Sequence, residues 1–361
     1  SMISAISSNL PALVLSRVLQ GVGSAAVLSV NGAIIRHIYP KKEFGRGISL
    51  NAGVVAIFAA IGPTVAAGIL TYCTWEWLFA INVPLGLLAL SLGVKHLPDF
   101  RTESKFDWSN AILCAMTMLI LIISIDGAGH QGKILQILIG FGFAIVMGIV
   151  LIQRELKVEI PLFPVDLYKI PLFASSIATS ICSFIAQMAA FTSLPFFMQY
   201  VLMRTEVETG LLMTPWPIAT ALVSVLAGRL ADRYPVGILC GLGLSIFAIG
   251  LVCIAQLPVE TTDFNIMWRM VICGIGFGLF QTPNNRAILG SAPTSRSAAA
   301  GGMMSTARLI GQTIGAAFVS LSFVAIPHEP TRTVLYSAGV LSLVAAGVSL
   351  IRVGKRFHYQ F

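Results

Sequence analysis

The stretch Leu15-Ser-Arg-Val-Leu-Gln-Gly-Val-Gly-Ser-Ala-Ala26 places an arginine inside a run that otherwise has the composition of a lipid-soluble helix. Polar or small residues follow Arg17 at offsets of three, four, seven and fourteen, so that on a helix they share one face with it. This stripe consists of Arg17, Gln20, Gly21, Ser24 and Asn31. A guanidinium in hydrocarbon costs at least ~2.5–3.5 kcal/mol on insertion scales, so Arg17 is expected to face protein or a wet cavity. Gly21 and Gly23 allow a neighbouring backbone to approach closely. We predict a functional arginine within the membrane; the alternative is that Arg17 snorkels to the interface.

The composition of the chain points to a bilayer as its solvent. Of 361 residues, 56% are hydrophobic and 11% charged, and the mean hydropathy is +0.87. Soluble domains carry about 25% charged residues. The net charge of +8 does not indicate a nucleic-acid partner, because the basic residues lie in short loops without interleaved aromatics. The six cysteines form no CxxC pair and no histidine lies at ligand spacing, so we expect neither a metal nor another cofactor.

A membrane span needs ~20 apolar residues, and reading for that length predicts an all-α membrane protein with eleven spans. They are Leu10–His37, Gly45–Tyr72, Trp77–Val94, Trp108–Ile125, Ile134–Ile152, Phe173–Val201, Gly210–Ala231, Val236–Leu257, Ile266–Ile288, Ala298–Ile326 and Thr333–Ile351. The connections between them are short and polar. No soluble domain is expected.

The distribution of lysine and arginine over alternate loops predicts the orientation. One set of loops, which includes the C-terminal tail, holds seventeen basic residues and the opposite set holds four. By the positive-inside rule the first set is cytoplasmic, and the C-terminus with it. With eleven spans, residue 1 then lies on the outer side. Because Ser1–Leu10 is uncharged and half apolar, it is interpreted as the outer end of an earlier helix, so we expect helices upstream of this chain.

A weak internal repeat predicts two related halves. The pattern at Arg17, Gly21 and Gly23 recurs at Arg269, Gly274 and Gly276, and in both places a basic loop and then a helix rich in small residues follow. Such repeats are typical of secondary transporters, whose site lies between the halves near the midplane.

At this point the chain resembles the fourteen-helix branch of the major facilitator superfamily, the drug:proton antiporter family 2. Four motifs carry the resemblance, in order: Arg17-Val-Leu-Gln-Gly-Val-Gly23 (fourth helix), Gly62-Pro-Thr-Val-Ala-Ala-Gly68 (the antiporter motif of the fifth helix), Trp75-Glu-Trp-Leu-Phe-Ala-Ile-Asn-Val-Pro-Leu-Gly86 (sixth-helix entry) and Gly228-Arg-Leu-Ala-Asp-Arg233 (the second-half copy of a cytoplasmic loop motif). The chain departs from them at Ala67, Glu76 and Tyr234-Pro235, where the family commonly has glycine, a basic residue and Gly-Arg.

The resemblance implies a helical bundle of two halves in which helices four to fourteen are present. Residues 1–97 would be the remainder of the N-terminal half, 98–170 two extra linker helices with a cytoplasmic loop, and 171–361 the six-helix C-terminal half. The first helices of the family, with an acid implicated in proton coupling, would be missing, and an inactive chain is one alternative.

The motif residues are expected to couple or gate, and each has a structural alternative. Gly62, Pro63 and Gly68 predict a bend and close packing at the central cavity. Asp232, between Arg229 and Arg233 and after Gly228, is interpreted as a charge latch that breaks during rocking; the alternative is a solvated loop pair worth under ~1 kcal/mol.

Other residues are assigned by position. Trp77, Asn82 and Pro84 are interpreted as structural, with Asn82 satisfying backbone left open by the proline. Arg308 is a second deeply placed arginine, with function and structure equally open. Aromatic, methionine and amide side chains on the two helices that open the second half suit a large lipophilic ligand, although packing is the alternative: Gln187, Met188, Phe191, Gln199 and Trp216.

The leading hypothesis is a proton-coupled exporter of lipophilic, often cationic, drug-like compounds in the inner membrane, working by alternating access as a monomer among lipids. A metabolite transporter of the same fold and a non-functional truncated product are the alternatives. An enzyme is not expected, since the five histidines lie at span ends or in loops.

Overall fold

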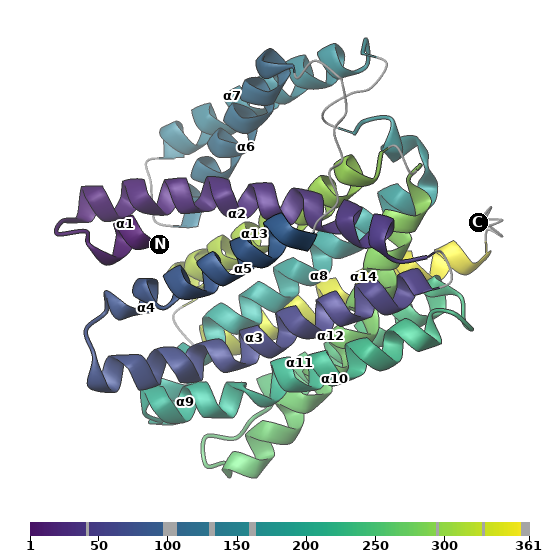
Figure 1. The fold of residues 1–361 in the computed structure, drawn as a ribbon. Helices are drawn as coiled ribbons and strands as arrows, with labels where there is room; N and C mark the ends of the chain where they lie inside the picture. Colours follow the sequence, from purple (N-terminus) through teal and green to yellow (C-terminus); the bar gives the residue numbers. More distant parts are fainter. Residues whose placement is uncertain are drawn as a thin grey trace.

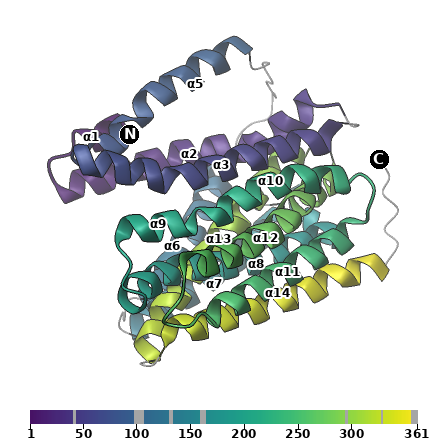
Figure 2. The ribbon, with the colours of Figure 1, turned by 90° about the horizontal axis from the view of Figure 1, so that it is seen from below.

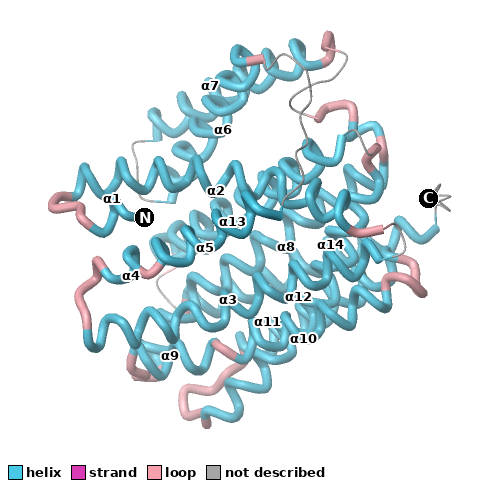
Figure 3. The backbone as a smooth tube through the Cα atoms, viewed as in Figure 1, coloured by secondary structure: helices cyan, strands magenta, loops and turns pink. Residues whose placement is uncertain are grey.

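The computed structural model describes residues 1–40, 43–96, 107–129, 134–158, 164–293, 296–326 and 329–354. Some side chains within these helices, including that of Pro63, lie outside the description. Over this part of the chain the structure is helical, without strands (Figure 3).

The first half contains α1 Met2–Ala5, α2 Leu10–Ile38, α3 Phe44–Tyr72, α4 Trp77–Ala80 and α5 Asn82–His96, and the linker pair is α6 Trp108–Gly129 and α7 Ile134–Glu155. The second half contains α8 Pro171–Phe196, α9 Glu206–Met213, α10 Pro215–Leu230, α11 Val236–Ala255, α12 Asp263–Ser291, α13 Ser297–Ala325 and α14 Pro330–Gly354. Two short elements flank α8: the 3₁₀ turn η2 Leu167–Lys169 and the π-helical turn η3 Phe197–Val201.

Ten helical segments in the described part are long and apolar enough to cross a membrane. The chain is therefore a multi-pass membrane protein. The predicted span Gly45–Tyr72 is not among the ten, although α3 occupies it as one helix of 29 residues. Two predicted spans are each built from two helical pieces: α4 with α5, and α9 with α10.

The second half has a dense core. Helices α10, α11, α12 and α14 pack side by side, and α8 packs against α13 and α14 (Figures 1 and 2). Glycines bring the backbones together: a Cβ on Gly274 would lie 2.3 Å from the carbonyl oxygen of Trp216, and one on Gly276 would lie 2.3 Å from the backbone nitrogen of Phe247. Close backbone approach at small residues is the usual way in which helices associate in lipid.

The first half meets the second along two helix pairs. Helix α3 packs against α10, and α2 packs against α13 (Figure 1). Helix α5 has no buried residue and stands apart from the main bundle (Figure 2). The α6–α7 hairpin pairs with itself and reaches the bundle through α13. The interface between the halves is therefore made by α2 and α3, which carry the predicted coupling residues.

Candidate functional site

An ion pair of the second half supports the start of α3. Asp232 lies in the turn after α10, and its carboxylate pairs with Arg286 of α12. A Cβ on Gly45 would lie 2.9 Å from Nη1 of Arg286 and 3.4 Å from Oδ1 of Asp232. The side chain of Arg286 is 19% exposed and that of Asp232 is 49% exposed. Because only glycine leaves this space, α3 rests directly on the pair.

A second contact joins the last turn of α2 to the last turn of α12. Nη1 of Arg36 donates hydrogen bonds to the carbonyl oxygens of Leu289 and Ala292, at 2.6 and 2.8 Å. Carbonyls at the C-terminus of a helix lack intrahelical partners and carry the negative end of its dipole. Arg36 therefore caps α12 from the other half of the molecule.

We call the end of the bundle where α2 ends and α3 begins the basic end, and the other end the opposite end. A third pair lies at the basic end, where Arg296 donates to Asp166 through Nε at 3.1 Å and Nη2 at 2.8 Å. Apolar side chains close the space beside these contacts in one cluster that includes Phe44, Ile48 and Leu289. In this structure the hydrogen bonds of Arg36 and this apolar cluster join the two halves at the basic end, and the two ion pairs support the segments beside them.

The structure gives the predicted latch residue Asp232 a partner on another helix. Among the described residues, the carboxylate of Asp232 pairs with Arg286 on another helix and not with its sequence neighbours Arg229 and Arg233, which are exposed. Gly228, one turn earlier, is buried in α10. The acidic residue of the loop motif thus links the end of α10 to α12.

The Arg17 stripe is partly covered: Arg17, Gly21 and Ser24 are exposed, whereas Gln20 donates to Ser1 at 2.9 Å and Asn31 donates to Asn51 of α3 at 3.0 Å. Nη1 of Arg17 donates to Oε1 of Gln20 at 2.6 Å, and the guanidinium lies 5.4 Å from the ring centroid of Phe79. No heavy atom lies within 4 Å of a Cβ built on Gly21 or Gly23. The expected close approach at these glycines is not seen, whereas the repeat partners Gly274 and Gly276 are tightly packed.

The fifth-helix motif is helical throughout. Helix α3 continues through Pro63, and Gly62 and Gly68 have open space around the Cβ position. The predicted close packing at these glycines is therefore not present in the described structure. The side chain of Pro63 lies outside the description.

The helix is interrupted within the sixth-helix entry motif. A break between α4 and α5 lies just before Pro84, and Nδ2 of Asn82 donates to the carbonyl oxygen of Leu78 at 3.1 Å. Trp77 is 58% exposed at the start of α4. The carbonyl that Pro84 leaves without its helical donor is that of Ala80, so this bond to Leu78 is not the one predicted, and the role of Asn82 stays a prediction.

Of the five predicted ligand-binding residues, Phe191 and Trp216 pack against each other. The rings of Phe191 and Trp216 lie 4.7 Å apart, but Trp216 is 1% exposed and continues into the core through Phe247 at 5.5 Å. Trp216 is therefore a packing residue in this structure. Gln187 and Met188 are half-buried on α8, and Gln199 lies in the π-helical turn beyond them.

Arg308 lies against α8 rather than in a loop. Its guanidinium is 6.0 Å from the ring centroid of Phe184 and is half-buried on α13. Phe184 lies one turn before Gln187 and Met188 on α8, so Arg308 shares the α8–α13 contact with them. Gly311 and Gly315 allow that contact, because a Cβ on either would lie within 2.8 Å of an α8 backbone oxygen.

Several residues at the site were not predicted from the sequence. Arg36, Arg286, Arg296 and Asp166 were read only as loop charges that set orientation. Their partners are distant in the chain, and no local pattern marks them. The one available signal is that each basic residue adjoins the end of a long apolar helix, where backbone carbonyls need donors.

Comparison with known proteins gives consistent matches. The sequence model of the Major Facilitator Superfamily matches residues 1–316 and 176–358. The chain is 48% identical to the uncharacterized transporter YebQ of Escherichia coli over 356 residues, which are 98% of this chain and 78% of that protein. It is 28% identical to the riboflavin transporter RibZ of Clostridioides difficile, over 90% of this chain and 70% of that protein. It is 27% identical to the multidrug efflux pump LfrA of Mycolicibacterium smegmatis, over 90% of this chain and 65% of that protein.

Proposed function

Because the chain belongs to the Major Facilitator Superfamily, we propose that it exports lipophilic, often cationic, drug-like compounds in exchange for protons by alternating access. Members of this family are transporters and not enzymes, and the chain is a multi-pass membrane transporter. The substrate, the coupling ion and the direction of transport are the proposed part.

The observation that carries the proposal is the set of contacts between halves at the basic end. Arg36 bonds to two carbonyls of α12, and Gly45 rests on the Asp232–Arg286 pair. The two hydrogen bonds of Arg36 cross between the halves at the end of α12, where water can replace them. The Asp232–Arg286 pair lies within the second half, and α3 packs on it. Contacts of this kind hold one arrangement of two rigid halves and break when the halves rock.

The direction and the substrate class are supported by likeness alone. Relatives at 27% identity are named for multidrug efflux and for lincomycin resistance. The Gly62–Gly68 motif resembles the antiporter motif of exporters. On this proposal the C-terminus and the basic end face the cytoplasm, the chain lies in the inner membrane, and it acts as a monomer.

Proton coupling is proposed to involve the Arg17 stripe. A guanidinium at membrane depth stabilises a nearby carboxylate in its charged form and lowers the affinity of that carboxylate for a proton. Arg17 is exposed beside the half-buried Gln20, so a membrane acid and water can reach its guanidinium. Asp232 would contribute by holding the basic end closed.

A metabolite transporter of the same fold is the second candidate. One relative at 28% identity is named as a riboflavin transporter, and its match covers 90% of this chain. The two candidates differ in substrate and not in fold.

Dye efflux distinguishes them. Cells without endogenous efflux pumps are loaded with ethidium or with riboflavin, and the initial rate of loss is compared between the chain, the same chain joined behind the N-terminal helices of the Escherichia coli relative, and empty cells. We expect ethidium loss that a protonophore abolishes. Riboflavin movement without ethidium loss would replace the drug assignment by the metabolite one. If neither compound moves with either form, both assignments fail.

A further inference from the structure

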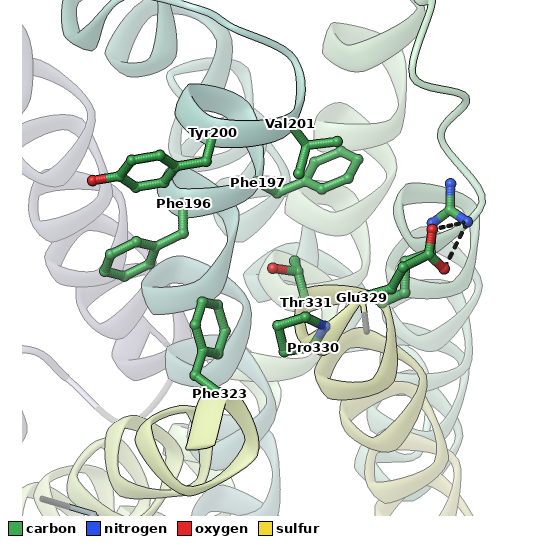
Figure 4. A pocket seen from close by; sticks show the side chains of 9 residues that line it. Phe196, Phe197, Tyr200, Val201, Phe323, Glu329, Pro330 and Thr331 are labelled. Carbon is green, nitrogen blue, oxygen red and sulfur yellow. Dashed lines mark hydrogen bonds and ion pairs between the residues drawn. The ribbon is translucent and has the colours of Figure 1, made fainter. Parts of the chain in front are cut away.

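A cavity of about 190 Å³ opens at the opposite end of the molecule (Figure 4). Three separate pieces of chain line it: the end of α8 with the π-helical turn η3, the end of α13, and the start of α14. None of the latch residues and none of the predicted ligand-binding residues lines it. It is thus separate from the interface described above.

Aromatic rings form one wall of this cavity. The rings of Phe196 and Tyr200 stack with centroids 6.2 Å apart and planes 12° apart, and Phe323 meets Phe196 edge-on at 5.4 Å. Phe196 is 46% exposed and Tyr200 is 70% exposed, so these ring faces are open to a ligand. An aromatic face carries negative electrostatic potential and attracts organic cations.

The backbone beneath this wall is irregular. Pro195 lies inside α8, and the following turn is π-helical, with the N–H of Leu202 donating to the carbonyl of Phe197 at 3.1 Å. A π-helical turn changes the direction in which successive side chains project, and such turns are frequent at functional sites. Here the turn places Phe197 and Tyr200 at the same cavity.

A carboxylate stands across from the rings. Glu329 has a φ of 51°, in the left-handed region that residues other than glycine rarely adopt. The following Pro330 restricts the backbone of Glu329 further. Its carboxylate pairs with Arg332 at 2.8 Å. Figure 4 shows Glu329 on the side opposite Phe196 and Phe323, with its carboxylate turned to its guanidinium partner. The unusual backbone therefore holds an acid at the rim of an aromatic cavity.

We propose that this cavity binds a small aromatic organic cation, whose ring lies against Phe196 and Tyr200 and whose charge is taken by Glu329. Its volume is below the ~300–1,000 Å³ of pockets for drug-sized ligands, so the cavity suits one ring with a compact ammonium group. The inference concerns a second binding site and does not depend on transport. On the proposed orientation the site lies at the outer end, where an exported cation leaves.

Arg332 should oppose the binding of a cation and favour the binding of an anion. Nη2 of Arg332 also donates to the carbonyl oxygen of Leu257 at 3.0 Å, so Arg332 keeps a partner when Glu329 turns to a ligand. An arriving cation competes with Arg332 for the carboxylate. Removing the arginine charge therefore strengthens the binding of a cation and weakens the binding of an anion.

Calorimetric titration of the purified full chain in detergent tests the proposal. Phenyltrimethylammonium is the probe, and its neutral isostere tert-butylbenzene is the reference of the same shape. We expect the cation to bind at least about tenfold more tightly than the isostere, Glu329→Gln to remove that difference, and Arg332→Gln to increase it. Tyr200→Ala weakens both ligands because it removes ring contact.

The control is Glu260→Gln, which removes an exposed carboxylate from the loop before α12 and leaves the cavity intact. Each variant is compared only if its thermal unfolding and its elution volume match those of the unsubstituted chain. Equal affinity for the cation and the isostere would overturn the proposal. Equal cation affinity in Glu329→Gln and Glu260→Gln would also overturn it, as would weaker cation binding in Arg332→Gln.

Discussion

Arg286 of α12 pairs with Asp232, which follows α10, and the pair lies directly under the backbone of Gly45. Two helices of the second half thus present their charges to the first turn of α3. The relationship links a sequence motif to the interface between halves. On the proposed mechanism this pair matters for transport, because it supports a helix whose position would change when the halves rock.

Loss of the carboxylate should weaken the closed basic end. Asp232→Asn leaves the mostly covered guanidinium of Arg286 without its charge partner, so we expect slower efflux. A double-mutant cycle with Arg286→Gln should give a coupling free energy of about 1 kcal/mol in the efflux rate, in the range of partly exposed pairs. Additive effects of the two substitutions would show that the pair does not act as a unit.

A methyl group at Gly45 should push the Arg286 guanidinium away from Asp232. Gly45→Ala places a Cβ 2.9 Å from Nη1 of Arg286, so we expect reduced efflux with little change in the amount of protein in the membrane. Gly290→Ala is the matched control, because a Cβ there meets nothing within 4 Å. In a helix, alanine is otherwise favoured over glycine by roughly 0.5–1 kcal/mol. Equal efflux by the two variants would contradict the packing described here.

A buried polar network in the second half should be necessary for stability. Nδ2 of Asn284 donates to the carbonyl of Ser176 at 3.1 Å and to Oγ of Ser180 at 2.8 Å, and Oδ1 of Asn284 accepts from Arg352 at 3.2 Å. Asn284→Ala removes three bonds from this buried site, although Arg352 keeps its bonds to Ser175 and Thr179. A buried group left unsatisfied costs about 1–3 kcal/mol. We expect a clearly lower melting temperature in detergent. The adjacent, half-buried Asn285→Ala serves as control, and an unchanged melting temperature in Asn284→Ala would argue against the network.

The sequence predicts the helices well and their partners poorly. The predicted span Trp108–Ile125 begins at the first residue of α6, and Leu10–His37 differs from α2 by one residue, because the length of an apolar run is a local property. The capping of α12 by Arg36 joins residues more than 250 positions apart, and no periodicity reports it. Trp216 shows the same limit, because the sequence pattern of an aromatic residue on an apolar helix is the same whether its side chain packs in a core or lines a cavity.

High pH should reveal the buried phenol before α8. Burial raises the pKa of Tyr168 to about 12, and its ring packs edge-on against Phe173 at 5.7 Å. The unfolded chain loses this proton near pH 10, whereas the folded chain keeps it to about pH 12, so stability from this group falls as the pH rises through that window. Between about pH 9.5 and 11, Tyr168→Phe should therefore lose less stability than the unsubstituted protein. Unfolding followed by fluorescence measures the difference. Parallel pH profiles of the two proteins would contradict this burial.

A reversible disulfide between the halves tests the central claim most directly. A Cβ on Gly32 of α2 would lie 3.6 Å from Cα of Gly301 on α13. The two Cα atoms are therefore at most about 5 Å apart, and disulfides join Cα atoms about 4.4–6.8 Å apart. The pair Gly32→Cys and Gly301→Cys should therefore cross-link on oxidation and hold the basic end closed. Dye efflux is measured before oxidation, after it, and after a reducing agent, with each single variant as control. We predict that efflux stops on oxidation of the double variant alone and returns on reduction. Undiminished efflux from fully cross-linked protein would contradict transport by separation of the two halves at this end.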